Sequence, residues 1–391
     1  MTRELPSGWE SVRLGDICRV EYGKGLSKKQ RVEAGSVYVY GSAGRVGRHD
    51  CALVEEPVII VGRKGNAGSV WLSDGPSWPI DTTFFLRPPD GLSHRFLALQ
   101  LGSRDLVQKD SSTTIPSLRR PDLEETRIDI APVREQERIV EAIEEHFSRL
   151  DAANRSLLAA EGKLRALPSI LANAATRGWA SEELGRVAEV FVGSTPSRSR
   201  SELWKGPVPW VSSGEVQFCR IRETRESISV GAVKADRIHP PGTVLLGMIG
   251  EGRTRGQAAI LDIAAAHNQN SAAIRVDRSK LIPEWLFHVF RAQYDANRSV
   301  GSGNNQLALN KARVQELAIP LPPLKEQTRL VRELGRAGGA VDHARAEVQR
   351  AQERCVALRK AVLAEAFSGR LVPQDIESEP ALALLERISS P

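Results

Sequence analysis

Apolar residues recur every seven positions through two stretches of the chain, residues 134–177 and 324–369. A seven-residue spacing of apolar residues is typical of helices that pair along a seam. Each stretch therefore predicts one long helix, which at 1.5 Å per residue would reach roughly 65 Å. The residues expected to pair the helices are Ile143, Leu150, Leu157, Leu164, Leu334, Val341, Val348 and Leu358.

Helices of this length cannot bury their apolar stripes within small domains of their own. Alanines along one side of each stripe allow a partner helix to approach closely. We therefore expect the two helices to pack antiparallel within the chain; the alternatives are separate helices on separate domains, or a seam used for homodimerisation. Pro168 is expected to kink the first helix. Gly335, Gly338 and Gly339 are expected to weaken the second by roughly 1 kcal/mol each and to interrupt its regularity.

The chain is an internal duplication. The segments "PVREQERIVEAI" (132–143) and "PLKEQTRLVREL" (323–334) share a proline, a Glu-Gln pair and the start of a long helix. Upstream, "GWESVRLGDI" (8–17) matches "GWASEELGRV" (178–187), and the second copy is longer in its middle part. Matches in the same order on both sides favour duplication over chance. Proline and Glu at a helix start are common by themselves, so a single match would carry little weight.

Each copy is predicted to contain an opening strand, a variable globular region, a proline-marked exit and a long helix. Glycine-rich segments such as "VGRKGNAG" (61–68) separate short apolar strands and are predicted to be β-turns. The fold class is therefore mixed α/β. The expected division is a first globular domain at 1–133, a first helix at 134–177, a second domain at 178–323, a second helix at 324–369, and a tail at 370–391.

Composition places few limits on function. The 391 residues include 54 Lys and Arg against 48 Asp and Glu, which leaves a net charge of +6 and a mild preference for an anionic partner. No stretch has the length of an apolar membrane span and the N-terminus lacks a signal peptide pattern, so we expect a cytoplasmic protein with no membrane partner. The four cysteines are too scattered to suggest a zinc site or disulfides.

Catalytic motifs are missing from the sequence. It contains neither a phosphate-binding Gly-x-x-x-x-Gly-Lys-Ser/Thr loop nor a His-Glu-x-x-His pair. No Asn/Asp-Pro-Pro-aromatic stretch of an amino-methyltransferase is present, and "PDLEETR" (121–127) lacks the Glu-x-Lys that a nuclease would add. We therefore expect no catalytic residue, no metal site and no cofactor in this chain.

Loop residues able to contact nucleic acid occur in both halves. Arg and Lys can bind phosphates or guanine, while Asn and Gln match adenine. On any one loop, such residues can equally be ordinary soluble turns. The segments "SSTTIPSL" (111–118) and "GNNQLAL" (303–309) lie at equivalent positions and are the first choice for contact with DNA. The candidate DNA-binding residues are Lys24, Lys28, Lys29, Arg45, Arg48, Arg63, Lys64, Thr113, Thr114, Arg119, Arg198, Arg200, Ser212, Ser213, Arg253, Arg255, Asn268, Gln269, Asn304, Asn305, Gln306 and Lys311.

Almost the whole chain resembles the specificity subunit of type I restriction-modification systems. The resemblance rests on the two Gly-Trp openings, on "WKGPVPWVSSGEV" (204–216), and on "NNQLALNKARVQELAIPLPPLKEQTRLV" (304–331). It also includes the helix end "LRKAVLAEAFSGRLVPQD" (358–375). The Pro-Pro-Leu-Lys-Glu-Gln phrase is highly specific when combined with the duplication.

The resemblance implies two target-recognition domains, each reading one half of a split DNA sequence, separated by paired helices with approximate two-fold symmetry. It also implies that the chain is non-catalytic and works with two copies of a methyltransferase subunit that binds S-adenosylmethionine and methylates adenine. Restriction and translocase subunits would complete the complex. One departure from the family lies at the end of the first helix, where the sequence is "TRGWA" (176–180). The second helix ends in "SGRL" (368–371), which is the type of ending that the family has.

These expectations combine into one mechanism. Loops of each domain would read the major groove, where all four base pairs can be distinguished. The helices would fix the gap between two unlike half-sites, which should lie roughly one turn of DNA apart. Partners would dock on the parts that the two halves share. The alternatives are a DNA-binding regulator without methyltransferase partners, and an enzyme whose active site leaves no motif.

Overall fold

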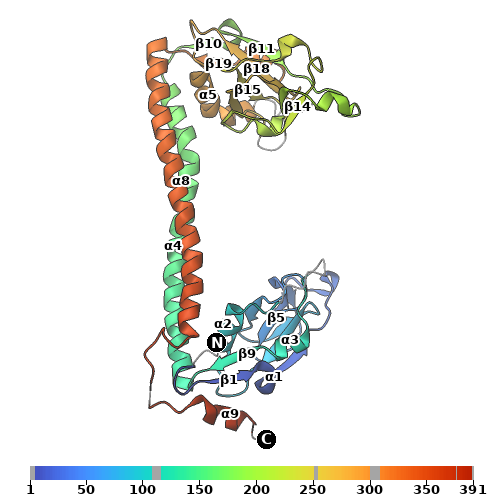
Figure 1. Cartoon of the computed structure of the whole chain (residues 1–391), viewed down its shortest axis with the longest axis vertical. Helices are drawn as coiled ribbons and strands as arrows, with labels where there is room; N and C mark the ends of the chain where they lie inside the picture. Colours follow the sequence, from blue (N-terminus) through green and yellow to red (C-terminus); the bar gives the residue numbers. More distant parts are fainter. Residues whose placement is uncertain (1–4, 108–115, 251–253, 300–308, 376, 390–391) are drawn as a thin grey trace. The chain divides into compact units, whose positions relative to one another are not determined.

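The computed structural model describes residues 5–107, 116–250, 254–299, 309–375 and 377–389. The chain divides into two compact units. The first unit comprises residues 1–157 and 350–391, and the second comprises residues 158–349. Both ends of the chain therefore belong to the first unit (Figure 1).

The first unit contains three sheets. The largest has the strand order β2-β8-β5-β6, and its neighbouring strands are antiparallel. A smaller sheet has the order β4-β3-β7, in which β3 pairs in parallel with β7. Strands β1 and β9 form a separate antiparallel pair. The strands are β1 (Glu10–Arg13), β2 (Arg19–Tyr22), β3 (Val37–Gly41), β4 (Gly44–His49), β5 (Ile59–Gly62), β6 (Val70–Leu72), β7 (Ser77–Pro79), β8 (Thr83–Arg87) and β9 (Arg127–Ile130).

Helix α2 packs on the largest sheet of the first unit. The alternation of apolar residues along β5 and β8 places Ile59 and Phe84 on the face that Leu97 and Leu101 of α2 cover. Ser93 begins α2, and its hydroxyl accepts a hydrogen bond from the Phe96 amide. The helices are α1 (Leu14–Ile17), α2 (His94–Ser103), α3 (Arg120–Glu124), α9 (Ala381–Ser389) and the short 3-10 helix η1 (Lys28–Gln30).

The second unit repeats this topology. Its largest sheet has the order β11-β18-β15-β16-β13, and its smaller sheet has the order β14-β12-β17. The strands are β10 (Ser181–Glu183), β11 (Ala188–Val192), β12 (Val208–Val211), β13 (Cys219–Ile221), β14 (Glu226–Ile228), β15 (Val244–Gly247), β16 (Ala258–Leu261), β17 (Ala266–His267), β18 (Ser271–Val276) and β19 (Ala318–Pro320). The helices are α5 (Pro283–Ala292), α6 (Tyr294–Ser299), α7 (Lys311–Gln315), and the 3-10 helices η2 (Leu184–Arg186), η3 (Ser201–Trp204), η4 (Ser213–Glu215) and η5 (Ala235–Arg237).

The duplicated topology confirms the mixed α/β fold and the internal repeat. Strand β12 pairs antiparallel with β14 and parallel with β17, as β3 does with β4 and β7. The predicted hairpins around the glycine-rich segments are present as β5-β6 and β15-β16. Strand β13 has no counterpart among the described residues of the first unit. It lies in the middle part where the second copy is longer, and it pairs in parallel with β16 at the edge of the sheet.

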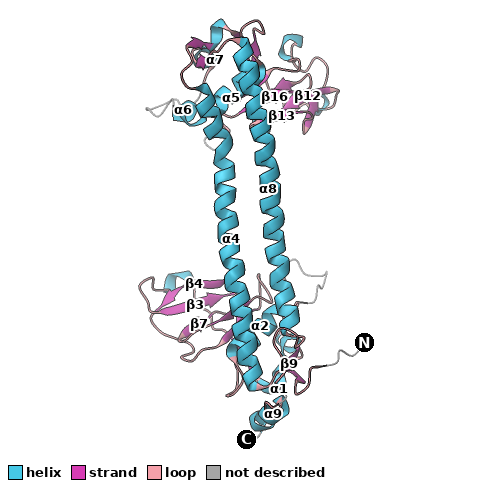
Figure 2. Cartoon of the chain, turned by 90° about the vertical axis from the view of Figure 1, so that its left-hand side faces the viewer, coloured by secondary structure: helices cyan, strands magenta, loops and turns pink. Residues whose placement is uncertain are grey.

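The two long helices are α4 (Val133–Thr176) and α8 (Leu324–Ala366). Within the first unit, Ile143 of α4 packs in a cluster with Val362 and Ala366 of α8, while Asp151 of α4 forms an ion pair with Arg359. Earlier residues of α4 therefore contact later residues of α8, which means that the two helices run antiparallel here. The segments of α4 and α8 in each unit lie side by side (Figure 2).

The pairing in the second unit has the same antiparallel direction. Arg345 of α8 donates to the backbone oxygen of Leu164 at 3.2 Å, and Leu330 of α8 shares a core cluster with Ala175 near the end of α4. The expectation of antiparallel helices that pair within the chain is thus confirmed in each unit. Both helices are continuous, so the expectation that three glycines interrupt α8 was wrong.

The predicted seam is only partly buried. Ile143 and Val341 are buried. Leu358 is 52% exposed, so its assignment to the seam was wrong. In a straight α-helix, residues spaced seven apart shift around the helix axis by about 20° per heptad. Leu358 lies four heptads after the buried Leu330, so its side chain points about 80° away from the direction of Leu330. The half-buried members of the seam are Leu150, Leu157, Leu164, Leu334 and Val348.

The repeated Glu-Gln phrase has a role inside each unit. Gln136 is fully buried; its Nε2 donates to Ala131 O at 2.8 Å and its Oε1 accepts from the Ser93 amide at 2.9 Å. Gln327 is also fully buried, and it makes the same kind of contacts with the Pro322 oxygen and the Ile282 amide. Each glutamine therefore joins the start of a long helix to the residue that begins α2 or α5.

The tail at 370–391 is part of the first unit's core. Ala381 and Leu384 of α9 are buried in the same cluster as Leu14 of α1. Upstream of α9, the amide of Gln374 donates to the carboxylate of Glu135 at 2.8 Å. The tail at 370–391 was predicted from the sequence, but no role was assigned to it. Instead it completes the domain in which the chain begins.

Within the described residues, no helix combines the length and the apolar composition needed to cross a membrane. In the same ranges, no three His, Cys, Asp or Glu side chains are grouped so that they could hold a metal ion.

Candidate nucleic-acid interface

The loop that follows the first strand of the largest sheet is held in both units by an indole. In the first unit this loop is residues 23–31, and Trp78 donates its ring N–H to Lys24 O at 2.8 Å. In the second unit it is residues 193–200, and Trp210 donates to Ser194 O at 3.1 Å. The two tryptophans come from different strands, β7 and β12. Both units therefore fix the same loop by the same kind of contact from different positions.

A tyrosine and two arginines form a cluster on the β3-β4 hairpin of the first unit. The guanidinium carbons of Arg45 and Arg48 lie 4.0 and 4.6 Å from the centre of the Tyr38 ring. Arg48 also donates to the Tyr38 hydroxyl at 3.0 Å, and Arg45 donates to the Tyr40 hydroxyl at 3.1 Å. The hydrogen bond from Arg45 to Tyr40 raises the pKa of that guanidinium. The hairpin therefore presents two ordered positive charges.

Further candidate cations of the first unit lie outside this hairpin. Arg63 lies 5.2 Å from the centre of the Tyr22 ring, which is 51% exposed, and donates to Asp81 O at 3.2 Å. Lys64 follows Arg63 at an isolated bridge to Ser117 and is exposed. Three other candidate lysines in the 23–31 loop are also exposed: Lys24, Lys28 and Lys29.

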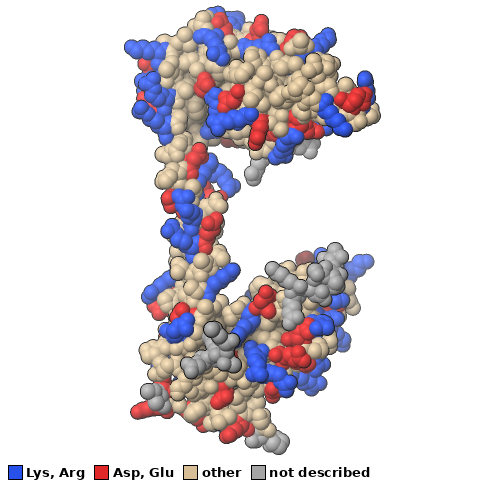
Figure 3. All heavy atoms as spheres, in the orientation of Figure 1, with Lys and Arg blue, Asp and Glu red and all other residues tan. Residues whose placement is uncertain are grey.

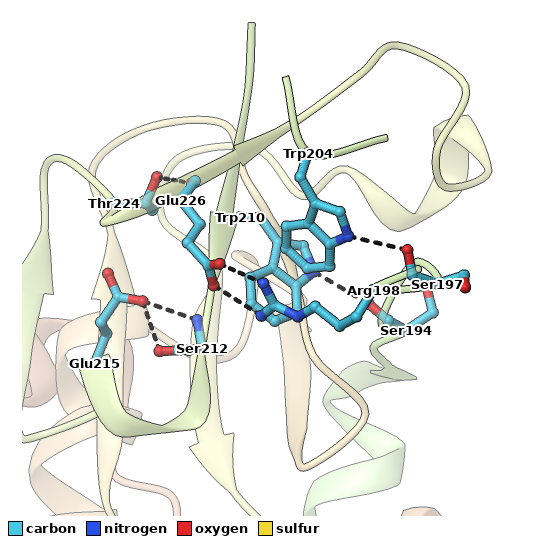
Figure 4. Close-up of polar contacts among 9 residues, drawn as sticks. All are labelled: Ser194, Ser197, Arg198, Trp204, Trp210, Ser212, Glu215, Thr224 and Glu226. Carbon is cyan, nitrogen blue, oxygen red and sulfur yellow. Dashed lines mark hydrogen bonds and ion pairs between the residues drawn. The ribbon is translucent and has the colours of Figure 1, made fainter. Parts of the chain in front are cut away.

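The second unit has an arginine and tryptophan cluster at the equivalent loop. The guanidinium carbon of Arg198 lies 3.5 Å from the centre of the Trp204 ring, and Trp204 donates its ring N–H to Ser197 O at 3.1 Å. Trp204 packs edge-on against Trp210 with ring centres 4.9 Å apart. Figure 4 shows Arg198 held between the Trp204 ring and the carboxylate of Glu226, which comes from β14.

Charge is balanced differently in the two clusters. Both terminal nitrogens of Arg198 donate to Glu226, and this contact raises the pKa of Arg198 and lowers that of Glu226. Arg45 has only an exposed carboxylate nearby, Asp74 at 3.7 Å, a distance at which an exposed ion pair contributes little. On the face drawn in Figure 3, basic and acidic atoms are interspersed over both units. The clusters are thus local features rather than parts of one large basic surface.

Two candidate residues of the second unit face inward. Arg255 is 9% exposed and donates to Arg298 O at 2.6 Å, while Asn268 is 7% exposed and its side-chain oxygen accepts from Ser271. Their assignment as DNA contacts was therefore wrong. Burying a polar side chain is costly unless it is hydrogen-bonded. The side chains of Arg255 and Asn268 form such hydrogen bonds with other residues of the chain.

The remaining candidates of the described ranges lie at or near the surface. Arg119 forms a two-pronged ion pair with Asp122, and Arg200 donates to Glu202. Ser212 and Ser213 are half-buried at the η4 turn, which Glu215 closes through Ser212. The other two, Gln269 and Lys311, are exposed. Six candidates lie outside the described residues: Thr113, Thr114, Arg253, Asn304, Asn305 and Gln306.

Sequence reasoning missed the aromatic partners of the arginines. Tyr38 lies on the strand before the one that carries Arg45 and Arg48, and Trp204 follows Arg198 closely in the sequence, whereas Glu226 is 28 residues from Arg198. A usable signal was present in "SELWKGPVPW" (201–210), where two tryptophans follow an arginine-rich loop. An aromatic ring beside a cluster of arginines favours cation–π contact.

Two buried histidines lie behind the second cluster. His267 of β17 is 1% exposed, and His239 is fully buried, with the two ring centres 5.1 Å apart. Burial lowers the pKa of His239 to about 3 and that of His267 to about 4. Ser271 contacts His267 Nδ1 at 2.9 Å, whereas neither ring nitrogen of His239 has a partner among the described residues. Both rings are therefore neutral near pH 7.

Solved structures with this fold cover nearly the whole chain. A chain from a study of complex assembly and conformational transition of the type I restriction-modification system matches with a TM-score of 0.74 at 20% identity. The HsdS subunit of Thermoanaerobacter tengcongensis matches with a TM-score of 0.56, also at 20% identity. Both matches cover 94% of this chain and 99% of the other, and they establish the fold.

Sequence comparisons identify relatives over shorter segments. The specificity subunit of the type I restriction enzyme MjaIX of Methanocaldococcus jannaschii is 26% identical over 161 residues, which is 39% of this chain and 36% of the relative. The StySPI specificity subunit of Salmonella potsdam is 28% identical over 128 residues, which is 30% of this chain and 28% of the relative. The matched segments therefore span about a third of these relatives' lengths.

The family model described as the type I restriction modification DNA specificity domain matches the chain twice, at residues 6–160 and 176–339. The two matches correspond to the two halves of the duplication and together include most of the chain. Each begins just before a Gly-Trp opening and contains one of the two arginine and aromatic clusters. The chain therefore belongs to the family of type I restriction-modification specificity subunits.

Proposed function

We propose that this chain is the non-catalytic DNA-recognition subunit of a type I restriction-modification complex and reads a bipartite, asymmetric double-stranded target. The observation that carries this proposal is the presence of two domains of one topology whose surface clusters differ in chemistry. Tyr38 with Arg45 and Arg48 gives the first domain a positively charged hairpin. Arg198 with Glu226 gives the second domain a cluster in which the charges are balanced. Unlike clusters on like scaffolds would read unlike half-sites.

We further propose that the division into domains follows the ranges predicted from the sequence. Residues 1–133 and 178–323 would be the two target-recognition domains. Residues 134–177 and 324–369 would be the spacer helices, to which we attribute a gap of fixed length between the half-sites. The chain would recruit two copies of an adenine methyltransferase subunit, on which S-adenosylmethionine would bind, together with restriction and translocase subunits. We place this complex in the cytoplasm.

The buried positions of Gln136 and Gln327 limit how partners could dock. Since both glutamines face inward and their polar atoms have partners, the repeated Glu-Gln phrase is explained by its role within each domain. Partners would therefore use exposed residues on the shared parts of the two halves.

Genome-wide mapping of methylated adenines, in a host with and without this gene, tests the function. We expect one bipartite motif with a constant gap to lose methylation when the gene is absent. Exchanging residues 20–115 for those of a relative should then change one half of the motif only. If both halves changed, or neither did, independent reading by the two domains would be wrong. Sequence-specific binding without any gene-dependent methylation would instead favour a DNA-binding regulator.

Binding of the isolated chain provides a second test. With a net charge of only +6, the chain alone should bind DNA weakly, and its affinity should fall steeply as salt is raised. Addition of the methyltransferase subunits should tighten binding to the mapped target. Catalytic turnover by the purified chain alone would contradict a non-catalytic role.

A further inference from the structure

The guanidinium group of Arg198 is fixed before any ligand arrives. One face lies on the Trp204 ring at 3.5 Å, and both terminal nitrogens donate to Glu226, with Nη2 to Oε2 at 2.9 Å. The side chain is nevertheless 56% exposed. Arg198 therefore combines a defined orientation with access from solvent.

The loop that carries Arg198 is also ordered. The indole of Trp204 holds Ser197 O and the indole of Trp210 holds Ser194 O, each at 3.1 Å. Trp210 is itself 2% exposed, so the second of these contacts is anchored in the core. A binding group that is already ordered loses less conformational entropy when its ligand binds.

The contact with Glu226 leaves several donors of Arg198 free. A guanidinium has five N–H groups, and the two-pronged contact needs one from each terminal nitrogen. The Nε–H and one neighbouring terminal N–H remain side by side along one edge of the plane. Among the described residues, no acceptor is recorded for this edge. Two adjacent donors match the O6 and N7 acceptors that guanine presents in the major groove.

The charge of Glu226 distinguishes a base from a phosphate as the ligand. Hydrogen bonding from Arg198 keeps Glu226 ionised by lowering its pKa. An ionised carboxylate beside the arginine repels a phosphate, because like charges placed side by side disfavour binding. Guanine is neutral and is not repelled in this way. The second cluster is therefore better suited to a base edge than to the DNA backbone.

We propose that Arg198 reads one guanine in the half-site bound by the second domain, with Glu226 and Trp204 as positioning residues. The inference rests on the proposed function and adds a specificity-determining residue to it. The cluster on the β3-β4 hairpin of the first domain is different, because Arg45 and Arg48 lie on Tyr38 and neither makes a two-pronged carboxylate contact among the described residues.

The test uses the complete complex with its methyltransferase subunits and duplexes that carry the mapped target. Each guanine of the second half-site is replaced, one at a time, by 7-deazaguanine, which lacks the N7 acceptor. We expect one position at which the replacement weakens binding by roughly 10-fold, within the range for a two-pronged base contact. In Arg198→Ala, the unmodified target should bind more weakly, and replacement at that position should cause no further loss.

Two variants act as controls. Arg222→Ala removes another exposed arginine of the second unit, which pairs with Asp262 and is not a candidate DNA contact, and it should keep the 7-deazaguanine effect. Arg198→Lys keeps the charge but loses the two-pronged geometry, so it should lose the effect at that guanine. Thermal melting of each variant shows whether it remains folded.

Glu226→Gln separates positioning from a purely structural role. Removing the negative charge should leave binding to unrelated duplex DNA unchanged or tighter. The preference for guanine over 7-deazaguanine should fall several-fold, because Arg198 loses one prong of its support. Equal losses on target and unrelated DNA would contradict a positioning role.

The inference is overturned if the 7-deazaguanine effect survives in Arg198→Ala at every guanine of the second half-site. It is also overturned if Arg198→Ala weakens target and unrelated DNA by the same factor, which would indicate a phosphate contact, or if that half-site contains no guanine. None of these three outcomes contradicts the proposal that the complex reads a bipartite target. A wild-type complex with no bipartite target would remove the proposed function, and the inference with it.

Discussion

The side-chain oxygen of Gln136 accepts a hydrogen bond from the backbone amide of Ser93 at 2.9 Å, across 43 residues of sequence. Gln327 accepts the same kind of bond from the Ile282 amide at 2.9 Å in the second unit. Each pair joins a long helix to the helix that packs on the main sheet. The duplicated phrase noticed in the sequence is thus explained by one internal contact that occurs in both domains.

Replacing either glutamine should destabilise its own unit. In Gln136→Ala and Gln327→Ala, buried backbone groups lose their partners, and an unsatisfied buried group costs about 1–3 kcal/mol. We expect a loss of about 3 kcal/mol in the free energy of unfolding, measured by chemical denaturation. Amide exchange should rise at the start of α2 in the first variant and of α5 in the second.

Neighbouring exposed positions provide the controls for the glutamine variants. Glu137→Ala and Thr328→Ala change exposed residues of the same helices and should change stability by no more than about 0.5 kcal/mol. If the glutamine variants were as mild as these, the buried contacts would not be holding the helices in place.

Alanine at two glycines of α8 should stabilise the chain. Gly335 and Gly339 lie inside the helix, and apart from the neighbouring residues and the backbone of the helix itself no described atom lies within 4 Å of a Cβ placed on either. Since glycine costs about 1 kcal/mol relative to alanine inside a helix, each substitution should raise the free energy of unfolding by up to that amount. Thermal melting measures the change.

Alanine at Gly193, unlike alanine at Gly335 or Gly339, should destabilise the chain. A Cβ at this position would overlap the backbone oxygens of His267 and Asn268, so this variant should lose stability. A gain there, or a loss at Gly335 and Gly339, would show that backbone crowding is not what decides these positions.

The buried histidines should make the second unit sensitive to acid. The folded pKa values of about 3 for His239 and about 4 for His267 lie below the ordinary value of 6.5. Between these values the unfolded chain binds protons that the folded chain does not, so stability decreases as the pH falls. The loss begins near pH 6.5 and approaches about 1.4 kcal/mol per pH unit for each histidine.

His239→Leu tests this assignment. Neither ring nitrogen of His239 has a partner among the described residues, so leucine removes no recorded hydrogen bond. The slope of unfolding free energy against pH between about 4 and 6 should become shallower by about 1.4 kcal/mol per unit. An unchanged slope in His239→Leu would assign the acid sensitivity to other groups.

Removing the tail should destabilise the first unit alone. Deletion of residues 370–391 strips Ala381 and Leu384 from the core and removes the contact of Gln374 with Glu135. Burial of one leucine contributes about 1.5–3 kcal/mol, so we expect a loss of at least about 3 kcal/mol. Hydrogen exchange should rise in β1, β9 and α2 and stay constant in the second unit.

Point variants separate packing from chain length in the tail. Leu384→Ala should reproduce part of the loss, whereas Leu382→Ala changes a residue that is 51% exposed and should have little effect. Similar behaviour of the two variants would mean that α9 does not contribute to the core.

Much of the architecture could be predicted because regular patterns carry it. The seven-residue spacing predicted both long helices and their antiparallel pairing, and the duplication predicted two domains of one topology. The strict repeat failed at Leu358 because the helices are not wound to it along their whole length. The role of α9 was missed because a short amphipathic helix gives no sign of which distant surface it covers.

The candidate site was predicted in part. Arg45, Arg48 and Arg198 were selected for their residue type and loop setting, and they are the residues that the structure places in ordered clusters. Arg255 and Asn268 were selected on the same grounds and are buried, because glycine-rich turns also need polar side chains to satisfy their backbone. The rings beneath the arginines come from β3 and from the 3-10 helix η3, and the way the chain folds these elements back onto the arginines is not visible in local sequence.

The composition of the first unit has a consequence for how the protein is made. Residues 158–349 form the second unit as one uninterrupted stretch, so it can fold as soon as that stretch has left the ribosome. The unit that contains residues 1–157 must wait for residues 350–389, which are synthesised after the whole of the second unit. The order of synthesis and the order of completion are therefore reversed, and a premature stop late in translation would damage the amino-terminal domain and spare the one that follows it.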